Sequence, residues 1–250
     1  MSDRPTNNHG PSAVGFAVVV PAAGIGVRMG RRKKPYLSVA GRPILDHTLE
    51  RLHRAEGCEQ TVVVVHKTDC GDADLASRLE EQFAVTDLVC GGSTRQASVW
   101  AGLQAVRDDL DLVLIHDAVR LMVAPGVVRR VAEAARRDGA AIAAIPARET
   151  VKEVNEGGII TGTPPRRRLW YARTPQGFHK ELIVKAHRQG RADGFHATDD
   201  AQLVERLGHP VSVVEDNYDN LKITTEEDLL IAEAILAWQQ GSTDSSPARS

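Results

Sequence analysis

The sequence predicts an α/β fold with a doubly wound, mostly parallel sheet, and three observations support this prediction. Four apolar runs of strand length recur at residues 16–23, 61–66, 111–118 and 140–147. Uninterrupted apolar runs are typical of strands buried on both faces of a parallel sheet. Stretches with helical spacing separate these runs, and a glycine-rich turn follows the first of them. The alternation implies right-handed crossovers, with helices on both faces of the sheet.

Helices are expected at residues 43–57, 94–108 and 125–139. In the first of them, Leu45, Leu49 and Leu52 recur at helical spacing and form an apolar face that can pack on the sheet. A closing helix is expected near the C-terminal end, where Thr224 and Glu227 have the spacing of a capping box.

Residues 148–176 interrupt this alternation. A Glu-Gly-Gly turn lies between two short β-like runs, and three consecutive arginines follow. This pattern predicts a hairpin arm, over about residues 148–175, that projects from the sheet. So small a hairpin cannot bury its own apolar side chains, and the simplest cover is a second copy of the chain. We therefore expect a homodimer that assembles through the arm.

Length and composition are those of a globular protein. The chain has 250 residues, of which 42% are apolar, enough for one large domain or two small ones. We expect a single domain at residues 14–239 between disordered polar tails at residues 1–13 and 240–250. No run approaches the roughly 20 apolar residues of a membrane span, and no secretory signal pattern begins the chain. We expect a cytoplasmic protein without a membrane partner.

Cysteine content and charge exclude other classes. Cys58, Cys70 and Cys90 are odd in number and form no C-x-x-C pair, so neither a disulfide framework nor a zinc site is expected. The formal net charge is −2 and aromatic residues make up 4% of the chain, which is a poor match for a nucleic-acid-binding protein.

The glycine turn lies within VVVPAAGIGVRMGRRKKPYL (residues 18–37), after the first predicted strand. Open α/β sheets bind ligands at this end of their strands. Gly24 and Gly26 can adopt positive φ and can let backbone N–H groups approach an anion. The basic residues that follow the turn predict phosphate binding. An ordinary glycine turn followed by a solvated basic stretch remains an alternative interpretation of the same residues.

Two other phosphate-binding motifs do not match. A dinucleotide fingerprint needs a third glycine where this chain has Met29, and an acidic residue where it has His66 and Lys67. The Walker sequence G-x-x-x-x-G-K-[ST] is absent. The loop instead carries Arg28, with Lys34 a few residues on, which suits the charge of a nucleoside triphosphate.

Eight motifs occur in an order that is specific to one family. They are PAAGIGVRMG, KKPYLSVAGRPILDHTL, GGSTRQASV, HDAVR, PARETVK, RTPQGF, TDDAQLVE and DNLKITTEEDL, and the match around them runs from about Val18 to Leu236. In these motifs the chain resembles the 2-C-methyl-D-erythritol 4-phosphate cytidylyltransferases. The resemblance implies a Rossmann-like nucleotidyltransferase fold and transfer of CMP from CTP to methylerythritol phosphate, with release of pyrophosphate, in non-mevalonate isoprenoid synthesis.

The resemblance also implies which residues bind CTP. They are Ala22, Ala23, Gly24 and Gly26 along the nucleotide, Arg28 and Lys34 on its phosphates, and Gly92 and Ser98 on cytosine and ribose. Counting back from Tyr36 favours Lys34 over Lys33 for the phosphate position. Without the resemblance, Gly92 would be interpreted as a plain turn and Ser98 as a surface helix residue.

The remaining implied residues hold the second substrate and a metal ion. They are Asp117 on the metal side, Arg120 on the substrate side, Thr150, Arg166, Thr174 and Thr198 around methylerythritol phosphate, and Lys222 between the substrate and the α-phosphate. The expected catalytic residues are Arg28, Lys34, Arg166 and Lys222, and the expected cofactor is Mg²⁺ held by Asp117. Taken alone, Asp117 could be a helix cap and Lys222 a surface lysine.

Three other functions are weighed against this one. Ribitol-5-phosphate cytidylyltransferases share the glycine loop and the TPQ and KITT elements, but Thr150 and Thr198 match positions that hold methylerythritol phosphate. The missing third glycine argues against a nicotinamide-dependent oxidoreductase. The intact positions of Arg28, Lys34 and Lys222 argue against a nucleotide-binding module without catalysis.

Overall fold

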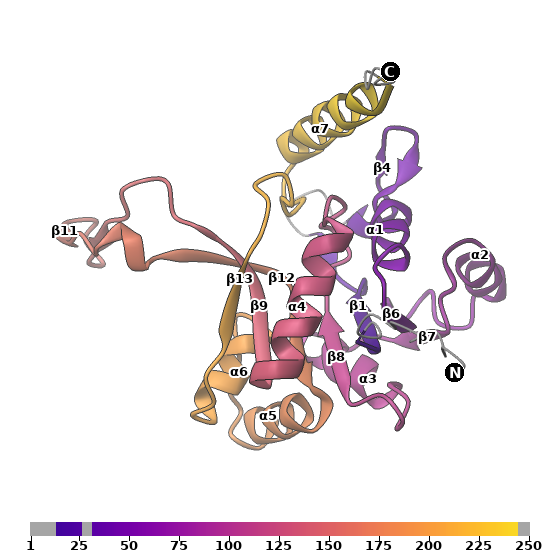
Figure 1. Cartoon of the computed structure of the whole chain (residues 1–250), viewed down its shortest axis with the longest axis horizontal. Helices are drawn as coiled ribbons and strands as arrows, with labels where there is room; N and C mark the ends of the chain where they lie inside the picture. Colours follow the sequence, from indigo (N-terminus) through magenta and orange to yellow (C-terminus); the bar gives the residue numbers. More distant parts are fainter. Residues whose placement is uncertain (1–13, 27–31, 245–250) are drawn as a thin grey trace, which may run out of the picture.

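The computed structural model describes residues 14–26 and 32–244, which form an α/β fold around one sheet of seven strands (Figure 1). Across the sheet the strands are β13 (Ser212–Glu215), β9 (Ala140–Pro146), β12 (Trp170–His179), β8 (Leu112–Ile115), β1 (Phe16–Pro21), β6 (Cys58–Val65) and β7 (Asp87–Cys90). Only β12 is antiparallel to its neighbours; the other pairs within this sheet are parallel. The predicted fold class is confirmed.

Helices cover both faces of the sheet. One face carries α1 (Ile44–His53), α2 (Ala73–Phe83) and α4 (Pro125–Asp138), and the other carries α3 (Arg95–Gln104), α5 (Lys180–Ala192) and α6 (Asp200–Arg206). In β1 the side chains alternate between the two cores, because successive residues of a strand point to opposite faces. Val18 and Val20 pack with α1 and Val19 packs with α3, which explains why this strand is apolar throughout.

The last helix, α7 (Glu226–Asp244), packs on a separate small core. Its start differs from the expected capping box. Asp228, and not Glu227, accepts hydrogen bonds from the backbone N–H groups of Thr224 and Thr225, at 2.7 and 2.9 Å. The helix begins two residues after Thr224, so Asp228 is the residue in the third helical position. Within the described residues, no helix has the length and apolar character needed to cross a bilayer.

The predicted hairpin arm is present, but it is shorter than expected. Strands β10 (Glu153–Val154) and β11 (Ile160–Gly162) pair as a hairpin that extends away from the sheet (Figure 1). Residues 170–175, assigned to the arm from sequence, instead belong to β12, where Trp170 pairs with Pro146. The sequence missed this strand because its alternation is weak, and its pairing with β9 across the arm is not encoded in local spacing.

Cys70 and Cys90 form a disulfide, so the expectation of no disulfide is wrong. Cys90 ends β7, and Cys70 lies in the turn after the neighbouring strand β6. Parallel pairing of these strands places the two Cα atoms 5.4 Å apart. A separation of 20 residues matches no local cysteine motif, so the pairing comes from the sheet and could not be predicted from spacing. Cys58 is a free thiol.

Candidate active site

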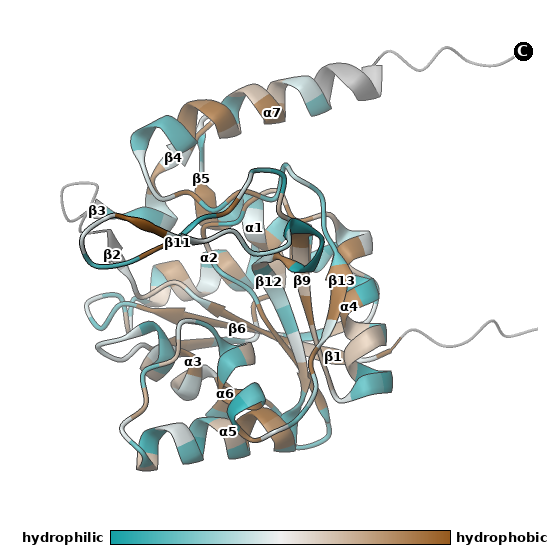
Figure 2. Cartoon of the chain, turned by 90° about the vertical axis from the view of Figure 1, so that its left-hand side faces the viewer, coloured by the Kyte–Doolittle hydropathy of each residue, from teal (hydrophilic) through white to brown (hydrophobic). Residues whose placement is uncertain are grey.

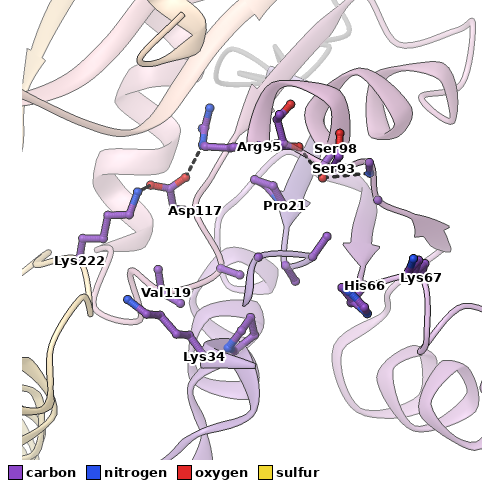
Figure 3. A pocket seen from close by; sticks show the side chains of 18 residues that line it. Pro21, Lys34, His66, Lys67, Ser93, Arg95, Ser98, Asp117, Val119 and Lys222 are labelled. Atoms are coloured by element: carbon purple, nitrogen blue, oxygen red, sulfur yellow. Dashed lines mark hydrogen bonds and ion pairs between the residues drawn. The ribbon is translucent and has the colours of Figure 1, made fainter. Parts of the chain in front are cut away.

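A pocket of about 890 Å³ opens at the carboxyl ends of β1, β6, β7 and β8, where ligands bind in sheets of this type. It is lined by Pro21, Ala22, Ala23, Gly24, Lys34, Pro35, His66, Lys67, Gly91, Gly92, Ser93, Thr94, Arg95, Ser98, Asp117, Ala118, Val119 and Lys222. Figure 3 shows Lys222 and Arg95 on either side of Asp117, which is the one acidic residue among the described lining residues, and Lys34, His66 and Lys67 on other parts of the wall.

The floor of the pocket continues β1. Ala22 donates its backbone N–H to Val64 O at 2.7 Å, which prolongs the strand by one residue before the chain turns away. Gly24 lines the pocket, and a Cβ added to it would meet nothing within 4 Å. It is not among the described glycines with positive φ, so the expected left-handed turn is absent there. A glycine at this position keeps space open for a ligand.

Lys34 and Lys33 point to different partners. Lys34 lies in a short 3-10 turn (Lys34–Tyr36), lines the pocket and donates from Nζ to Thr224 O at 2.8 Å. Lys33 instead contacts Asp69 and donates to Thr68 Oγ1 at 2.8 Å. This geometry favours Lys34 for the phosphate position, as the sequence count did. Arg28 lies outside the described residues.

The glycine pair before α3 allows a close approach between segments. A Cβ on Gly91 would lie 2.3 Å from Ala23 Cβ, and one on Gly92 would lie 2.5 Å from Ala97 Cβ. Ser98 Oγ accepts a hydrogen bond from the Gly92 N–H at 3.2 Å and donates to Thr94 O at 2.9 Å. Ser98 therefore holds the loop in place, and the plain-turn interpretation of Gly92 does not account for this packing.

Asp117 is the electrostatic centre of the site. Lys222 Nζ lies 2.8 Å from its Oδ2, and Arg95 donates from Nε to its Oδ1 at 2.9 Å. Arg120 Nε lies 3.7 Å from Oδ2. Burial alone would raise the pKa of Asp117, but the charges of Arg95, Lys222 and Arg120 outweigh burial and hold that pKa below its usual value. Asp117 is therefore ionised at neutral pH.

The segment before Lys222 is held by buried polar groups. Asn220 O accepts hydrogen bonds from Arg120 at 3.0 Å and from Arg173 at 2.9 Å. The Asn220 side chain donates to Thr174 O at 3.0 Å. Thr174 is buried, and its Oγ1 accepts a hydrogen bond from the Asp117 backbone N–H at 3.0 Å. Arg120 and Thr174 were both expected to contact substrate. They instead hold Asp117 and the segment before Lys222 in place, and neither is among the described residues that line the pocket.

Three expected substrate residues lie away from this pocket. Arg166 and Thr150 are exposed on the arm, where Arg166 donates to Arg148 O at 2.6 Å. Thr198 is exposed just before α6, where it donates to Gln202 Oε1. The pocket of one chain therefore brings Asp117 and Lys222 together with six of the expected CTP residues, Ala22, Ala23, Gly24, Lys34, Gly92 and Ser98. Gly26 pairs with Arg32 in a short two-stranded sheet and is not among the described lining residues. The pocket does not bring in Arg166, Thr150 or Thr198.

Four further residues near the pocket did not emerge as site residues from sequence. His66 and Lys67 follow β6 at the pocket wall, and Arg95 begins α3. Asp200, in α6, accepts a hydrogen bond from Arg95 at 2.7 Å. The signal for His66 and Lys67 was their place at the end of a parallel strand. Arg95 and Asp200 lie in the motifs GGSTRQASV and TDDAQLVE, but their pairing joins distant parts of the chain and gave no signal of its own.

Metal-binding potential is limited to one acidic residue. Across residues 14–26 and 32–244, no three His, Cys, Asp or Glu side chains gather as a metal-binding group. Mg²⁺ is commonly held by one or two carboxylates together with substrate phosphates, and it keeps several of its waters. A single ionised carboxylate on the wall of an otherwise basic pocket fits that pattern.

Comparison with known families gives a match along almost the whole described chain. The family described as IspD, 2-C-methyl-D-erythritol 4-phosphate cytidylyltransferase, matches residues 16–238. The chain is 44% identical over 225 residues to the 2-C-methyl-D-erythritol 4-phosphate cytidylyltransferase of Desulforamulus reducens, which covers 88% of this chain and 95% of the relative. It is 46% identical over 224 residues to that of Geotalea uraniireducens, with 87% and 95% covered.

Solved structures agree with the sequence comparison. The fold is similar to 4-diphosphocytidyl-2C-methyl-D-erythritol synthase from Anaerococcus prevotii, with a TM-score of 0.80, 33% identity, and 90% and 97% of the two chains covered. The similarity to 2-C-methyl-D-erythritol 4-phosphate cytidylyltransferase from Thermus thermophilus has a TM-score of 0.73 at 37% identity, with 90% and 100% covered.

Proposed function

The chain belongs to the 2-C-methyl-D-erythritol 4-phosphate cytidylyltransferase family, and we propose that its pocket performs the family reaction by positioning and charge stabilisation. The enzyme transfers CMP from CTP to 2-C-methyl-D-erythritol 4-phosphate in isoprenoid synthesis, which gives 4-diphosphocytidyl-2-C-methyl-D-erythritol and pyrophosphate. The observation that carries the proposed mechanism is that Lys34, Arg95 and Lys222 line the same pocket as Asp117, with Arg95 and Lys222 in contact with its carboxylate.

The chemistry requires no general base from the protein. A phosphate monoester is already ionised at neutral pH, and its oxygen attacks the α-phosphorus of CTP while pyrophosphate leaves. The barrier comes from bringing two polyanions together and from charge that develops in the transition state. Preorganised cations in a pocket reduce that barrier, because they need no reorganisation at the moment of reaction.

We assign roles along this path. Lys34 and Arg28 stabilise the triphosphate and the departing pyrophosphate, and Lys222 guides the incoming phosphate toward the α-phosphorus. Gly91 and Gly92 line the pocket where we place the cytosine and ribose, and the lack of a Cβ on each lets the loop pack tightly against Ala23 and Ala97. Ser98 keeps this loop in place through its hydrogen bond with Gly92.

Mg²⁺ is the proposed cofactor and Asp117 its proposed ligand. When bound, it would neutralise charge on the triphosphate and help to orient it. Asp117 Oδ2 is the atom that Lys222 contacts. The Lys222 side chain is 40% exposed, so it can leave that carboxylate and turn to a phosphate when nucleotide enters.

We further propose that the enzyme is a homodimer in which each arm reaches the partner's pocket. Val154, Ile159 and Ile160 of the arm are 58–66% exposed, and the hydropathy colouring of the ribbon in Figure 2 marks apolar residues at β11. Exposed apolar side chains on a two-stranded arm favour a protein partner. Arg166 and Thr150 lie on that arm and not at their own pocket. We also propose a cytoplasmic location, where CTP is available.

One assay tests the function. Pyrophosphate release is measured with CTP and either 2-C-methyl-D-erythritol 4-phosphate or ribitol 5-phosphate, side by side. We expect turnover with the former, a preference for CTP over ATP, GTP and UTP, and loss of activity in excess chelator. Faster turnover with ribitol 5-phosphate would reassign the substrate, and full activity in chelator would remove the metal from the mechanism.

A further inference from the structure

Arg95 lies between two buried carboxylates, those of Asp117 and Asp200, at the edge of the pocket. Figure 3 shows its contact with Asp117. Its Nε donates to Asp117 Oδ1 at 2.9 Å, and one of its terminal nitrogens donates to Asp200 Oδ2 at 2.7 Å. Asp117 follows strand β8 and Asp200 lies in the first turn of α6, 105 residues from Arg95 in sequence. One side chain therefore joins α3, the end of β8 and α6.

The place of Arg95 in its own helix does not explain this arrangement. Arg95 is the first residue of α3, where the helix dipole disfavours a positive charge. The N-cap Thr94 already accepts a hydrogen bond from the Ala97 N–H at 3.0 Å, and no acidic residue lies in the first turn. The cation is balanced by carboxylates that other elements bring to it.

Asp200 is anchored on its far side. It is 1% exposed, and its Oδ1 lies 3.1 Å from Nε2 of the fully buried His187. The Asp200 backbone N–H also donates to Gln176 Oε1 at 3.1 Å. The carboxylate is bonded through both of its oxygens and the backbone of the residue is anchored as well, so Asp200 gives the Arg95 guanidinium a fixed support.

Fixing Arg95 also fixes Asp117. With Oδ1 bonded to Arg95, the carboxylate turns Oδ2 toward Lys222. Only a planar guanidinium can donate to two carboxylates in set directions in this way. A lysine supplies the same charge from a single nitrogen.

We propose that Arg95, supported by Asp200, is a positioning residue that orients Asp117 so that Oδ2 faces Lys222 and the cation bound with CTP. This inference rests on the proposed function, which gives Asp117 its role toward the cation. Partners that orient a metal ligand without touching the metal typically change affinity or activity by about 10–100-fold when they are replaced.

The test compares Arg95→Lys and Asp200→Asn with the wild type in two measurements. The first is binding of Mn²⁺ together with CTP, followed by electron paramagnetic resonance without the second substrate. The second is kcat and KM in pyrophosphate release. We expect both variants to bind Mn²⁺ at least about tenfold more weakly in the presence of CTP and to lose kcat by a similar factor. KM for the methylerythritol phosphate should stay near the wild-type value.

The matched control is Arg78→Lys. Arg78 contacts Asp46 at 2.9 Å, and the exposed fractions of that pair, 33% and 9%, are close to the 30% and 9% of Arg95 and Asp117. Arg78 is not among the described residues that line the pocket, so kcat and Mn²⁺ binding should not change. A purely structural role for Arg95 would lower the melting temperature as Arg78→Lys does and leave both readouts unaffected.

The outcomes separate this inference from the proposed function. A wild-type enzyme that releases no pyrophosphate from CTP overturns the function, while Mn²⁺ binding still reports on Arg95. An active wild type with unchanged Mn²⁺ binding and kcat in folded Arg95→Lys overturns the inference. If Arg95→Lys does not fold, Asp200→Asn decides alone, and wild-type behaviour of that variant also overturns it.

Discussion

Lys222 Nζ lies 2.8 Å from Asp117 Oδ2, although the two residues come from opposite halves of the chain. The pair joins the segment before α7 to the end of β8, and both side chains line the pocket. This ion pair holds Lys222 at the pocket wall, and the proposed mechanism has a phosphate compete with Asp117 for it.

The first prediction concerns this lysine. Lys222→Ala should lower kcat by roughly 10²-fold, the size typical of losing one preorganised charge. Lys222→Arg should recover part of that loss, because it restores the charge with a different shape. Steady-state pyrophosphate release measures both. Lys185→Ala, on the exposed surface of α5, is the control, and an equal effect there would show that the loss is not specific to the pocket.

The second prediction separates neighbouring lysines. Lys34→Ala and Arg28→Ala should each cut turnover by roughly 10²-fold or more, with a smaller fall in CTP affinity. Lys33→Ala should change turnover much less, since Lys33 contacts Thr68 and Asp69. Turnover and CTP binding by calorimetry check this. Near-normal turnover in Lys34→Ala with strong loss in Lys33→Ala would reverse the assignment.

The third prediction concerns Gly91. Its added Cβ would lie 2.3 Å from Ala23 Cβ, a short rigid side chain that cannot turn aside. Gly91→Ala should therefore destabilise the fold by about 1–3 kcal/mol, as overpacking does. Gly24→Ala meets nothing within 4 Å, so it should keep stability and weaken CTP binding instead. Urea unfolding and CTP titration distinguish them, and equal stability of the two variants would contradict the packing argument.

The fourth prediction concerns pH and the buried His116. Burial lowers its pKa from 6.5 to about 4. Below pH 6.5 the His116 imidazole binds a proton in the unfolded chain but stays neutral in the folded chain. The free energy of unfolding therefore falls as the pH falls from 6.5 toward 4. In chelator, the unfolding free energy of the wild type should change more steeply than that of His116→Gln, by about 1.4 kcal/mol per pH unit. Parallel slopes would rule out His116 as the source.

The fifth prediction concerns the shared site. Arg28→Ala and Arg166→Ala homodimers should each be almost inactive. In a mixed dimer, one pocket contains both substitutions and the other pocket contains neither, because each pocket combines Arg28 of one chain with Arg166 of the other. Random re-pairing of equal amounts makes about half the dimers mixed, so activity should recover to about a quarter of wild type. If mass spectrometry shows subunit exchange and activity stays at the parental level, Arg166 acts within its own chain.

Much of the fold followed from the sequence alone, because it depends on local patterns. The apolar runs at β1, β6, β8 and β9 marked strands buried on both faces, and their alternation with helices determined the sheet class. The glycine loop, Asp117 and Lys222 belonged to motifs whose order identified the family. These signals can be recognised in the sequence alone, because each depends on residues that are close together in the chain.

Tertiary structure decided the relationships between distant residues. Strand β12, the Cys70–Cys90 disulfide and the Arg95–Asp200 contact each depend on which elements lie side by side. The structure also gives Lys34 and Lys33 different partners, which agrees with the choice of Lys34 that counting back from Tyr36 had favoured. The physical reason is that hydrogen bonds and ion pairs require separations of a few ångströms, and strand order and register set those separations. No local spacing encodes that a guanidinium on α3 will meet a carboxylate on α6.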